Sequence, residues 1–442
     1  MVKAEWKYLK DHKLMVGVLI VLMLVPLLYT TIFLSSMWDP YGKTDNLPVA
    51  VINKDEGATY AGQKIDIGDK LVKNLKKKDS FDFKFKKNEK QAKKDLKEGK
   101  YYMVLVIPKN FSKRSTTIFT DKPKKMNLDY YTNYGSSYVA GKMTSSGAEK
   151  IANSLDKTVA KSYTTAMFSS IKQLQGGLTQ AANSNKQIAQ AAGAAGAVGA
   201  QMAQANTKLA QGLEQASQQL SSVKLNEKNI DTLVSPVQLH SHDDSDVPNN
   251  GTGMTPYMMS VALFVGCLAL NLMYDVAAPR KKPKTGISWW AAKMSVIGTF
   301  AILQAIVAYA GMVWFLGLDP VHPWATLGVV VMASLAFSNL VTLLNAAFGK
   351  VGAFLSLVLL IVQLGGSGGT YPIQLSNSFF EGIHDWLPLS YSVHGLRESL
   401  MIGQSTSSDL WVLFGVAIVS ALLMIWVFRI RANHKIYAEP EI

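Results

Sequence analysis

The stretch LMVGVLIVLMLVPLLYTTIFLSSMW, residues 14–38, decides the class of this protein. It carries no charged residue and exceeds the roughly 20 apolar residues that a helix needs to cross a bilayer core of about 30 Å. A cleaved signal peptide is the alternative, but the apolar core is too long for one and no small-residue cleavage site follows. We therefore expect a retained first transmembrane helix.

Five further apolar blocks lie in the C-terminal part of the chain, at about residues 257–274, 291–316, 324–348, 351–364 and 410–428. The block 351–364 is short and runs into the glycine-rich sequence GGSGG. The sequence therefore predicts an α-helical polytopic membrane protein with six transmembrane helices in a 1+5 arrangement. The last five would form a membrane domain over residues 256–430.

Positive charge predicts the orientation of these helices. Basic residues occupy every second connection: residues 1–13, the loop with Arg280, Lys281, Lys282 and Lys284, the junction at Lys350, and the tail 431–442. We therefore expect both termini in the cytoplasm and residues 39–255 outside the cell membrane. Residues 1–13 are compatible with an amphipathic helix on the inner face, with Trp6, Tyr8 and Leu9 toward lipid.

Composition narrows the class further. Of 442 residues, 48% are hydrophobic and 17% charged, and the formal net charge is +14. Such a charge suggests nucleic acid when it is spread over one globular domain. Here the apolar and basic residues occupy separate blocks, so we expect no nucleic-acid partner. A single cysteine, Cys267, excludes an intramolecular disulfide.

Residues 39–135 predict an external α/β domain. The expected strands are PVAVIN (48–53), FDFKF (82–86), YYMVLVIP (101–108) and MNLDYYTN (126–133), and the expected helices cover about residues 62–77 and 88–100. The lysine-rich faces are most simply solvated surface. Attraction to anionic wall polymers or lipid head groups is the functional alternative.

Residues 136–225 predict a helical hairpin resembling a coiled coil, with arms of about 40 residues. The expected apolar seam includes Met167, Ile171, Leu174, Leu178, Ala181, Ile188, Met202, Leu209 and Leu213, and AAGAAGAVGA (191–200) is the expected turn. A linker over residues 226–255 follows. Its cluster of His240, His242, Asp243, Asp244 and Asp246 does not fit an EF-hand, and a polar linker is preferred over a metal site.

Polar residues are sparse inside the expected spans. Asn271, Gln304, Asn339, Asn345 and Gln363 are expected to hydrogen-bond to neighbouring helices, and lining of a path is the alternative. No ionisable residue lies well inside a span, which counts against a proton- or ion-coupled transporter. The aromatic residues near span ends, including Tyr274, Trp289 and Trp290, are expected mostly as interface anchors.

The chain contains no GxxxxGK[ST], HExxH or CxxC motif. It therefore lacks the loop that holds ATP phosphates in P-loop proteins. We expect no catalytic centre, no cofactor and no metal site in this chain. ATP-driven transport would require an ATPase on a separate polypeptide.

Several stretches resemble the YhgE/Pip family of Gram-positive bacterial membrane proteins. They are residues 5–58, KDLKEGKYYMVLVIPKNFS (94–112) and VPNNGTGMTPYMMSVALFVGCLALNL (247–272). The five C-terminal spans resemble type-2 ABC transporter permeases, and LPLSYSVHGLRESL (387–400) is similar to the turn before the last span of those permeases. The external helical region is shorter here than in many family members.

The resemblance implies a permease-like protein that acts in the lipid bilayer as a homodimer or heterodimer with a separate ABC ATPase. In type-2 permeases the loop after the second span contacts the ATPase, which implies Arg280, Lys281, Lys282, Lys284, Trp289 and Trp290 as coupling residues. The alternative role of the four basic residues among them is to set the membrane topology.

An external gate is the second candidate site. Its residues are Gly365, Gly366, Gly368, Gly369, Pro388 and Arg397. A glycine-rich break at membrane depth is tolerated where it lines protein or water. A simple helix end is the alternative interpretation of these glycines.

Two functions remain open. The first is a permease subunit of an ABC exporter that moves an amphiphilic or cell-envelope substrate. The second is a non-transporting scaffold or receptor, as implied by relatives such as the type VII secretion component EsaA and a phage infection protein.

Overall fold

A computed structural model describes residues 1–60, 63–193, 196–221, 227–235, 245, 247–434 and 436. The chain divides into two compact units. Residues 1–42 and 242–442 form one, here called the membrane unit, and residues 43–241 form the other, here called the inserted unit. His240, His242, Asp243, Asp244 and Asp246 lie outside the described residues, as does the tail from residue 437.

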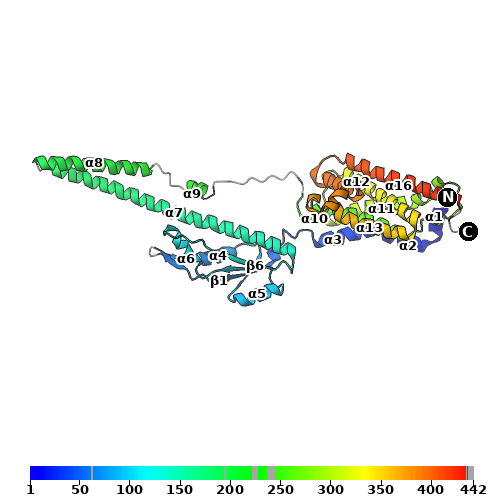
Figure 1. Cartoon of the computed structure of the whole chain (residues 1–442), viewed down its shortest axis with the longest axis horizontal. Helices are drawn as coiled ribbons and strands as arrows, with labels where there is room; N and C mark the ends of the chain where they lie inside the picture. Colours follow the sequence, from blue (N-terminus) through cyan, green and yellow to red (C-terminus); the bar gives the residue numbers. More distant parts are fainter. Residues whose placement is uncertain are drawn as a thin grey trace. The chain divides into compact units, whose positions relative to one another are not determined.

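The membrane unit is a bundle of long helices (Figure 1). They are α1 (Val2–Asp11), α2 (Lys13–Met23), α3 (Val25–Ser36), α10 (Asn250–Met273), α11 (Gly286–Leu316), α12 (Pro323–Phe348), α13 (Lys350–Gly366) and α16 (Ser407–Asn433). Among the described residues, five helical segments are long and apolar enough to span a membrane, with α2 and α3 counted as one. The sixth expected span is α13, whose 17 residues rise only about 25 Å. The multi-pass helical architecture is thus confirmed.

Short elements connect α13 to α16. They are the 3₁₀ turns η3 (Ile373–Leu375) and η4 (His384–Trp386), the helices α14 (Ser378–Ile383) and α15 (Pro388–Arg397), and the π-helical turn η5 (Glu398–Ile402).

Proline and glycine determine how the first span packs. Pro26 lies in the first turn of α3, where a residue without an N–H is tolerated, and the helix is interrupted at Leu24. A Cβ atom on Gly266 of α10 would lie 2.7 Å from the Pro26 ring, and one on Gly311 of α11 would overlap Leu27. Small residues thus allow α3 to approach both helices closely.

The end of the first span is fixed to the start of α10. The Gly251 N–H donates to the Trp38 carbonyl oxygen at 2.7 Å, and the Asn250 side chain donates to the Met37 carbonyl at 2.9 Å. The Trp38 ring also fills the space that a side chain at Gly251 would need. Within the membrane unit, the end of the first span and the start of α10 therefore lie side by side.

Polar residues in the bundle follow the expectation only in part. Gln304 donates across helices to Ser334 Oγ at 2.9 Å, and Gln363 accepts from the Leu389 N–H at 3.0 Å. Asn271, Asn339 and Asn345 instead donate to the carbonyl four residues earlier in their own helices. For these three the expected interhelical bonding was wrong, because a short amide side chain reaches its own helical turn first.

The inserted unit begins with an α/β layer. Its elements are η1 (Thr44–Asn46), β1 (Pro48–Asn53), β2 (Ala58–Tyr60), β3 (Gln63–Ile65), α4 (Ile67–Leu75), β4 (Asp82–Lys86), α5 (Glu89–Lys97), β5 (Met103–Ile107), α6 (Phe111–Ser115), η2 (Thr116–Phe119) and β6 (Asp129–Thr132). Four strands form a sheet in the order β4-β1-β5-β6, with β1 parallel to β4 and β5, and β6 antiparallel to β5. All four predicted strands are present.

The helix expected at about residues 62–77 begins later than predicted. Residues 63–65 pair with β2 in a small hairpin, and α4 starts at Ile67. The Asp66 carboxylate accepts the Asp69 N–H at 3.2 Å and so caps the helix.

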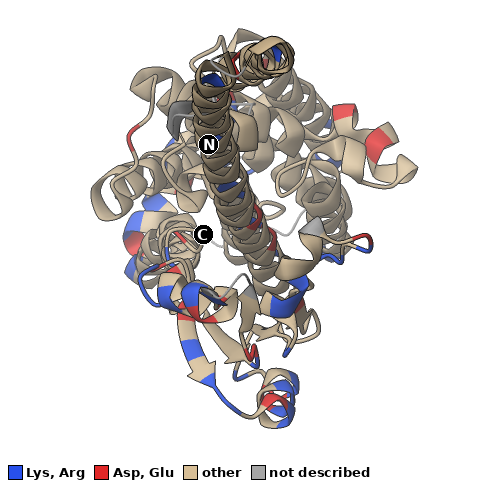
Figure 2. Ribbon diagram, turned by 90° about the vertical axis from the view of Figure 1, so that its left-hand side faces the viewer, with Lys and Arg blue, Asp and Glu red and all other residues tan. Residues whose placement is uncertain are grey.

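Helices cover both faces of the four-stranded sheet. Leu71 and Leu75 of α4 and Ile151 of α7 pack on one face, while Ala92 and Leu96 of α5 pack on the other. Figure 2 shows Lys and Arg crowded on this α/β layer, whereas the long helices of the membrane unit are mostly uncharged.

A long hairpin completes the inserted unit. It consists of α7 (Tyr138–Gly193) and α8 (Gly196–Ser221), which pack along each other, and α9 (Glu227–Val234) follows (Figure 1). The prediction of two arms of about 40 residues each was wrong, because α7 has 56 residues and α8 has 26.

The seam of the hairpin also differs from the expected one. Leu174, Ile188, Met202 and Leu209 are about half exposed. The buried seam is formed by smaller residues, including Ala182, Ala189, Gly199 and Ala210. Small side chains let two helices approach closely, so Leu174, Ile188, Met202 and Leu209 lie outside the contact. Three other residues of the expected seam, Ile171, Leu178 and Leu213, are half-buried.

Candidate functional site

A buried ion pair fixes the N-terminal helix to the start of α11. The Lys293 side chain is fully buried and the Glu5 side chain is 1% exposed, and Lys293 Nζ lies 2.9 Å from Glu5 Oε1. Lys293 also donates to the Asp275 carbonyl at 3.0 Å, and the Tyr274 hydroxyl donates to Glu5 Oε2. Two buried charges are tolerated because each has further hydrogen-bond partners.

The loop 275–285, here called the basic loop, holds the same helix from a second direction. The Arg280 guanidinium lies over the Tyr8 ring at 3.8 Å from its centre. Lys281, Lys282 and Lys284 are exposed. Helix α1, the basic loop and the start of α11 therefore form one connected assembly that presents three exposed lysine side chains.

The two aromatic coupling candidates differ in burial. Trp289 is fully buried and stacks on Phe428, with ring centres 4.6 Å apart, and Trp290 is half-buried. Tyr274 is fully buried as well, and Leu9 packs in the same apolar cluster. Tyr274 and Trp289 are thus core residues rather than interface anchors, and Leu9 faces protein rather than lipid.

Sequence reasoning missed Glu5 and Lys293. Two signals pointed to them: Glu5 is an acidic residue in a lysine-rich segment, and Lys293 lies within an apolar block. Lys293 is about two turns inside α11, so it lies near one end of the bundle rather than at mid-depth. It therefore does not resemble the central ionisable group of a proton-coupled transporter.

The gate candidates meet at the C-terminal end of α13. Arg397 Nη2 donates to the carbonyls of Gly368 and Gly369, at 2.8 and 2.9 Å. Gly368 has a φ of +64°, a backbone conformation that favours glycine. One guanidinium thus fixes the turn that follows α13.

Packing closes the turn further. A side chain at Gly369 would overlap the Tyr257 ring, and a Cβ atom at Gly365 would lie 2.7 Å from Phe380. His384 Nδ1 lies 2.6 Å from the Gly366 carbonyl oxygen. Pro388 is buried in the first turn of α15, next to the Leu389 N–H that bonds to Gln363. The structure therefore brings all six gate candidates into one closed cluster.

The run Gly365–Gly369 also matches the spacing G-x-S-x-G of serine hydrolases. That motif presents its serine on a sharp turn from a strand to a helix. Here the run ends the helix α13, and Ser367 is buried. The match therefore gives no support to a nucleophile.

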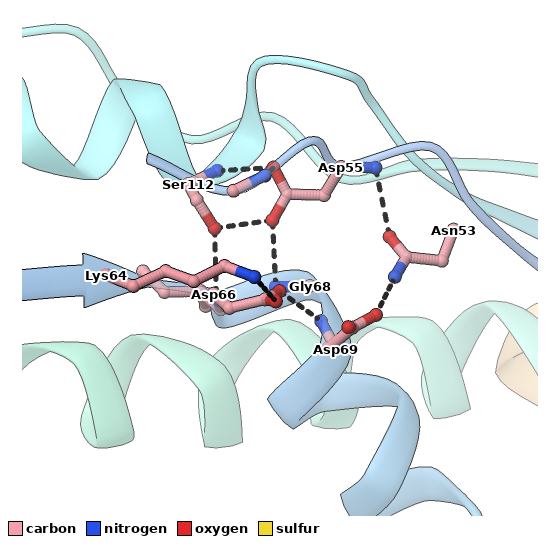
Figure 3. Close-up of polar contacts among 9 residues, drawn as sticks. Asn53, Asp55, Lys64, Asp66, Gly68, Asp69 and Ser112 are labelled. Carbon is pink, nitrogen blue, oxygen red and sulfur yellow. Dashed lines mark hydrogen bonds and ion pairs between the residues drawn. The ribbon is translucent and has the colours of Figure 1, made fainter. Parts of the chain in front are cut away.

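A polar cluster lies after the carboxyl end of β1, where many α/β proteins bind ligands. Figure 3 shows Asp55 between two helix starts. Its carboxylate accepts hydrogen bonds from the Ser112 N–H at 2.9 Å, the Gly68 N–H at 3.1 Å and the Ser112 hydroxyl. The Asn53 side-chain amide donates to Asp69 Oδ1 at 2.7 Å. Because Asp55 occupies the amide groups that an anion would use, this cluster is structural.

The comparisons with known proteins agree with the membrane unit just described. Residues 16–430 match the family model of the ABC-2 family transporter protein. The chain belongs to this family. Membership accounts for the multi-pass helical architecture.

Two relatives confirm the YhgE-like and EsaA-like resemblance. The uncharacterized protein YhgE of Bacillus subtilis (strain 168) is 42% identical over 178 residues, which are 40% of this chain and 23% of YhgE. The type VII secretion system accessory factor EsaA of Staphylococcus aureus (strain USA300) is 28% identical over 133 residues, which are 30% of this chain and 13% of EsaA. The matches thus span less than a quarter of either relative. No solved structure matches this chain.

Proposed function

We propose that this chain is the membrane subunit of an ATP-driven exporter whose ATPase is a separate polypeptide. The observation that carries the proposal is the Glu5–Lys293 pair within an ABC-2 family membrane unit. It connects α1 and the basic loop to α11, so a force on either element is transmitted to the helix bundle. Lys281, Lys282 and Lys284 are the side chains that would meet the ATPase.

The proposed movement ends at the gate cluster. Force on α11 would rearrange the bundle until Arg397 releases the carbonyls of Gly368 and Gly369. An amphiphilic or cell-envelope substrate would then leave beside α13. In this arrangement both termini and the basic loop are cytoplasmic, residues 39–255 are outside, and two copies or two related chains form the path.

Co-purification from the native membrane in a mild detergent, followed by mass spectrometry, tests the proposal. We expect a P-loop ATPase to accompany the wild-type chain and to be lost from the variant Lys281→Gln/Lys282→Gln/Lys284→Gln. The matched control, Lys13→Gln/Lys350→Gln/Arg429→Gln, removes three exposed charges from the same end of the bundle and should keep the ATPase.

Absence of any ATPase from the wild-type sample would contradict the exporter. If both triple variants lose the ATPase to the same extent, the basic loop is not its specific contact.

A scaffold is the second candidate function, favoured by the similarity to the secretion accessory factor EsaA. The half-exposed apolar residues Leu174, Ile188, Met202 and Leu209 offer such a scaffold a contact surface. The same purification distinguishes the two functions. Secretion components that are lost on changing these four residues to Gln, with no ATPase present, would support the scaffold.

A further inference from the structure

A long groove runs through the inserted unit between α4 and α7. It has a volume of about 1020 Å³ and is lined on α7 from Ile151 to Gln173. At 1.5 Å per residue, that stretch of helix is about 33 Å long. The volume is at the upper end of the range for small-molecule sites.

The floor of the groove is apolar. Leu71 and Leu75 of α4 line it together with Leu155 and Val159 of α7. The first three belong to the core beneath the sheet or pack against it, and Val159 is buried. Further along α7, the lining contains Tyr163 and Ala166. The floor therefore matches an extended hydrocarbon chain.

One edge of the groove is strongly basic. Lys70, Lys77 and Lys78 line it and are exposed. Lys64 also lines it, and its Nζ lies 3.9 Å from Asp66 Oδ2. None of the described lining residues is acidic. The other edge carries hydroxyl groups along α7, including Ser154, Thr158, Ser162 and Ser169.

We propose that this groove binds an anionic glycerophospholipid, with an acyl chain on the apolar floor and the phosphate among Lys70, Lys77 and Lys78. Lysine binds phosphate as a point charge. The hydroxyl groups of Ser154 and Ser169 can donate to glycerol and ester oxygens, whereas those of Thr158 and Ser162 already donate to carbonyls of α7 and offer only their oxygens. The pairing of a long apolar floor with an edge of one charge sign distinguishes this surface from an ordinary solvated lysine face. The binding stands apart from transport, because a scaffold with the same groove would bind the same lipid.

Photo-crosslinking to the full chain in phosphatidylcholine nanodiscs tests the proposal. The probe is lysophosphatidylglycerol with a diazirine in its acyl chain, and the comparison probe is lysophosphatidylcholine with the same chain. We expect the anionic probe to label the tryptic peptide 162–172 of α7 preferentially. The peptide mapping separates the groove from annular lipid around the membrane unit.

Two variants locate the interaction. Lys70→Glu/Lys77→Glu/Lys78→Glu should reduce labelling of that peptide at least about tenfold, since each basic residue contributes to lipid attraction. The control Lys87→Glu/Lys90→Glu/Lys97→Glu makes the same charge change on exposed residues that do not line the groove, and it should label normally. Ala166→Trp, which fills the groove without removing core side chains, should also abolish labelling.

Three outcomes would overturn the proposal. They are equal labelling by the two probes, equal labelling of the two triple variants, and labelling confined to peptides of the membrane unit. Unchanged thermal unfolding of each variant shows that a loss of labelling does not come from misfolding.

Discussion

At the scale of single residues, Glu5 and Lys293 form a buried ion pair in the membrane unit. Removing one member of a buried ion pair leaves the other charge without compensation. We expect Glu5→Ala to lower the free energy of unfolding by about 3–5 kcal/mol, measured by thermal unfolding in detergent. The control Lys7→Ala changes an exposed residue of the same helix and should have little effect.

A paired replacement checks the cause. Glu5→Leu/Lys293→Met removes both charges and should recover most of the stability, because apolar replacements of buried pairs are often neutral. If the single and paired variants are destabilised equally, the loss of stability does not come from an unpaired buried charge.

Arg397 fixes the glycine turn at the other end of the bundle. Arg397→Met removes two hydrogen bonds from a charged donor, each contributing about 1.5–3 kcal/mol. We expect faster hydrogen–deuterium exchange over residues 367–371, with residues 258–270 of α10 unchanged. Arg397→Lys keeps a positive charge and should show an intermediate rate. Unaltered exchange in Arg397→Met would mean that ring packing alone holds the turn.

At the scale of elements, α5 is tied to the rest of the α/β layer by charge. Hydrogen bonds and charge from Lys54 and Lys93 hold the pKa of Glu89 below its ordinary value. A carboxylate with a lowered pKa contributes stability that is present above its unfolded pKa and is lost as pH falls through the folded pKa. This contribution should therefore be complete at pH 6 and fade below about pH 4.

The measurement is hydrogen–deuterium exchange of α5 between pH 6 and pH 3.5, corrected for the intrinsic pH dependence of exchange. Glu89→Gln should lose the pH-dependent protection, with an effect of no more than about 1 kcal/mol for such a surface network. Glu149→Gln, an exposed carboxylate on α7, is the control. A pH profile that Glu89→Gln leaves unchanged would assign the protection to other groups.

The hairpin depends on the small size of its seam residues. Ala210 of α8 is fully buried, so Ala210→Leu adds volume where two helices meet and should cost about 1–3 kcal/mol. We expect faster exchange along α8 and little change in β1 and β5. Leu209→Ala, at the neighbouring half-exposed position, should be nearly neutral. A larger loss of stability in Leu209→Ala than in Ala210→Leu would instead support the seam predicted from the sequence.

At the scale of the whole molecule, orientation in the membrane can be tested cleanly. Cys267 is buried, so labelling of an added cysteine has little background. A membrane-impermeant maleimide applied to intact cells should label Lys97→Cys in the inserted unit and spare Lys282→Cys in the basic loop, while both react after the cells are opened. Labelling of Lys282→Cys in intact cells would reverse the proposed topology.

The sequence by itself determined the properties that depend on local composition. Apolar length and charge spacing identified the membrane helices, and runs such as MVLVI (103–107) identified the buried strands, because these signals are contained in neighbouring residues. The sequence also singled out the glycines at and after the end of α13 together with Arg397, although not the hydrogen bonds that join Arg397 to Gly368 and Gly369.

Only the tertiary structure decided which side chains meet. The sequence could not show that Glu5 pairs with Lys293, that Trp289 stacks on Phe428, or that Asp55 caps two helices, because each partner lies far along the chain. It also misassigned part of the hairpin seam, since Leu174 and Ile188 fit a helical period although the smaller Ala182 and Ala189 are the buried residues. The physical reason is common to these cases: a one-dimensional pattern fixes the face of an element, whereas its partner is fixed by packing in three dimensions.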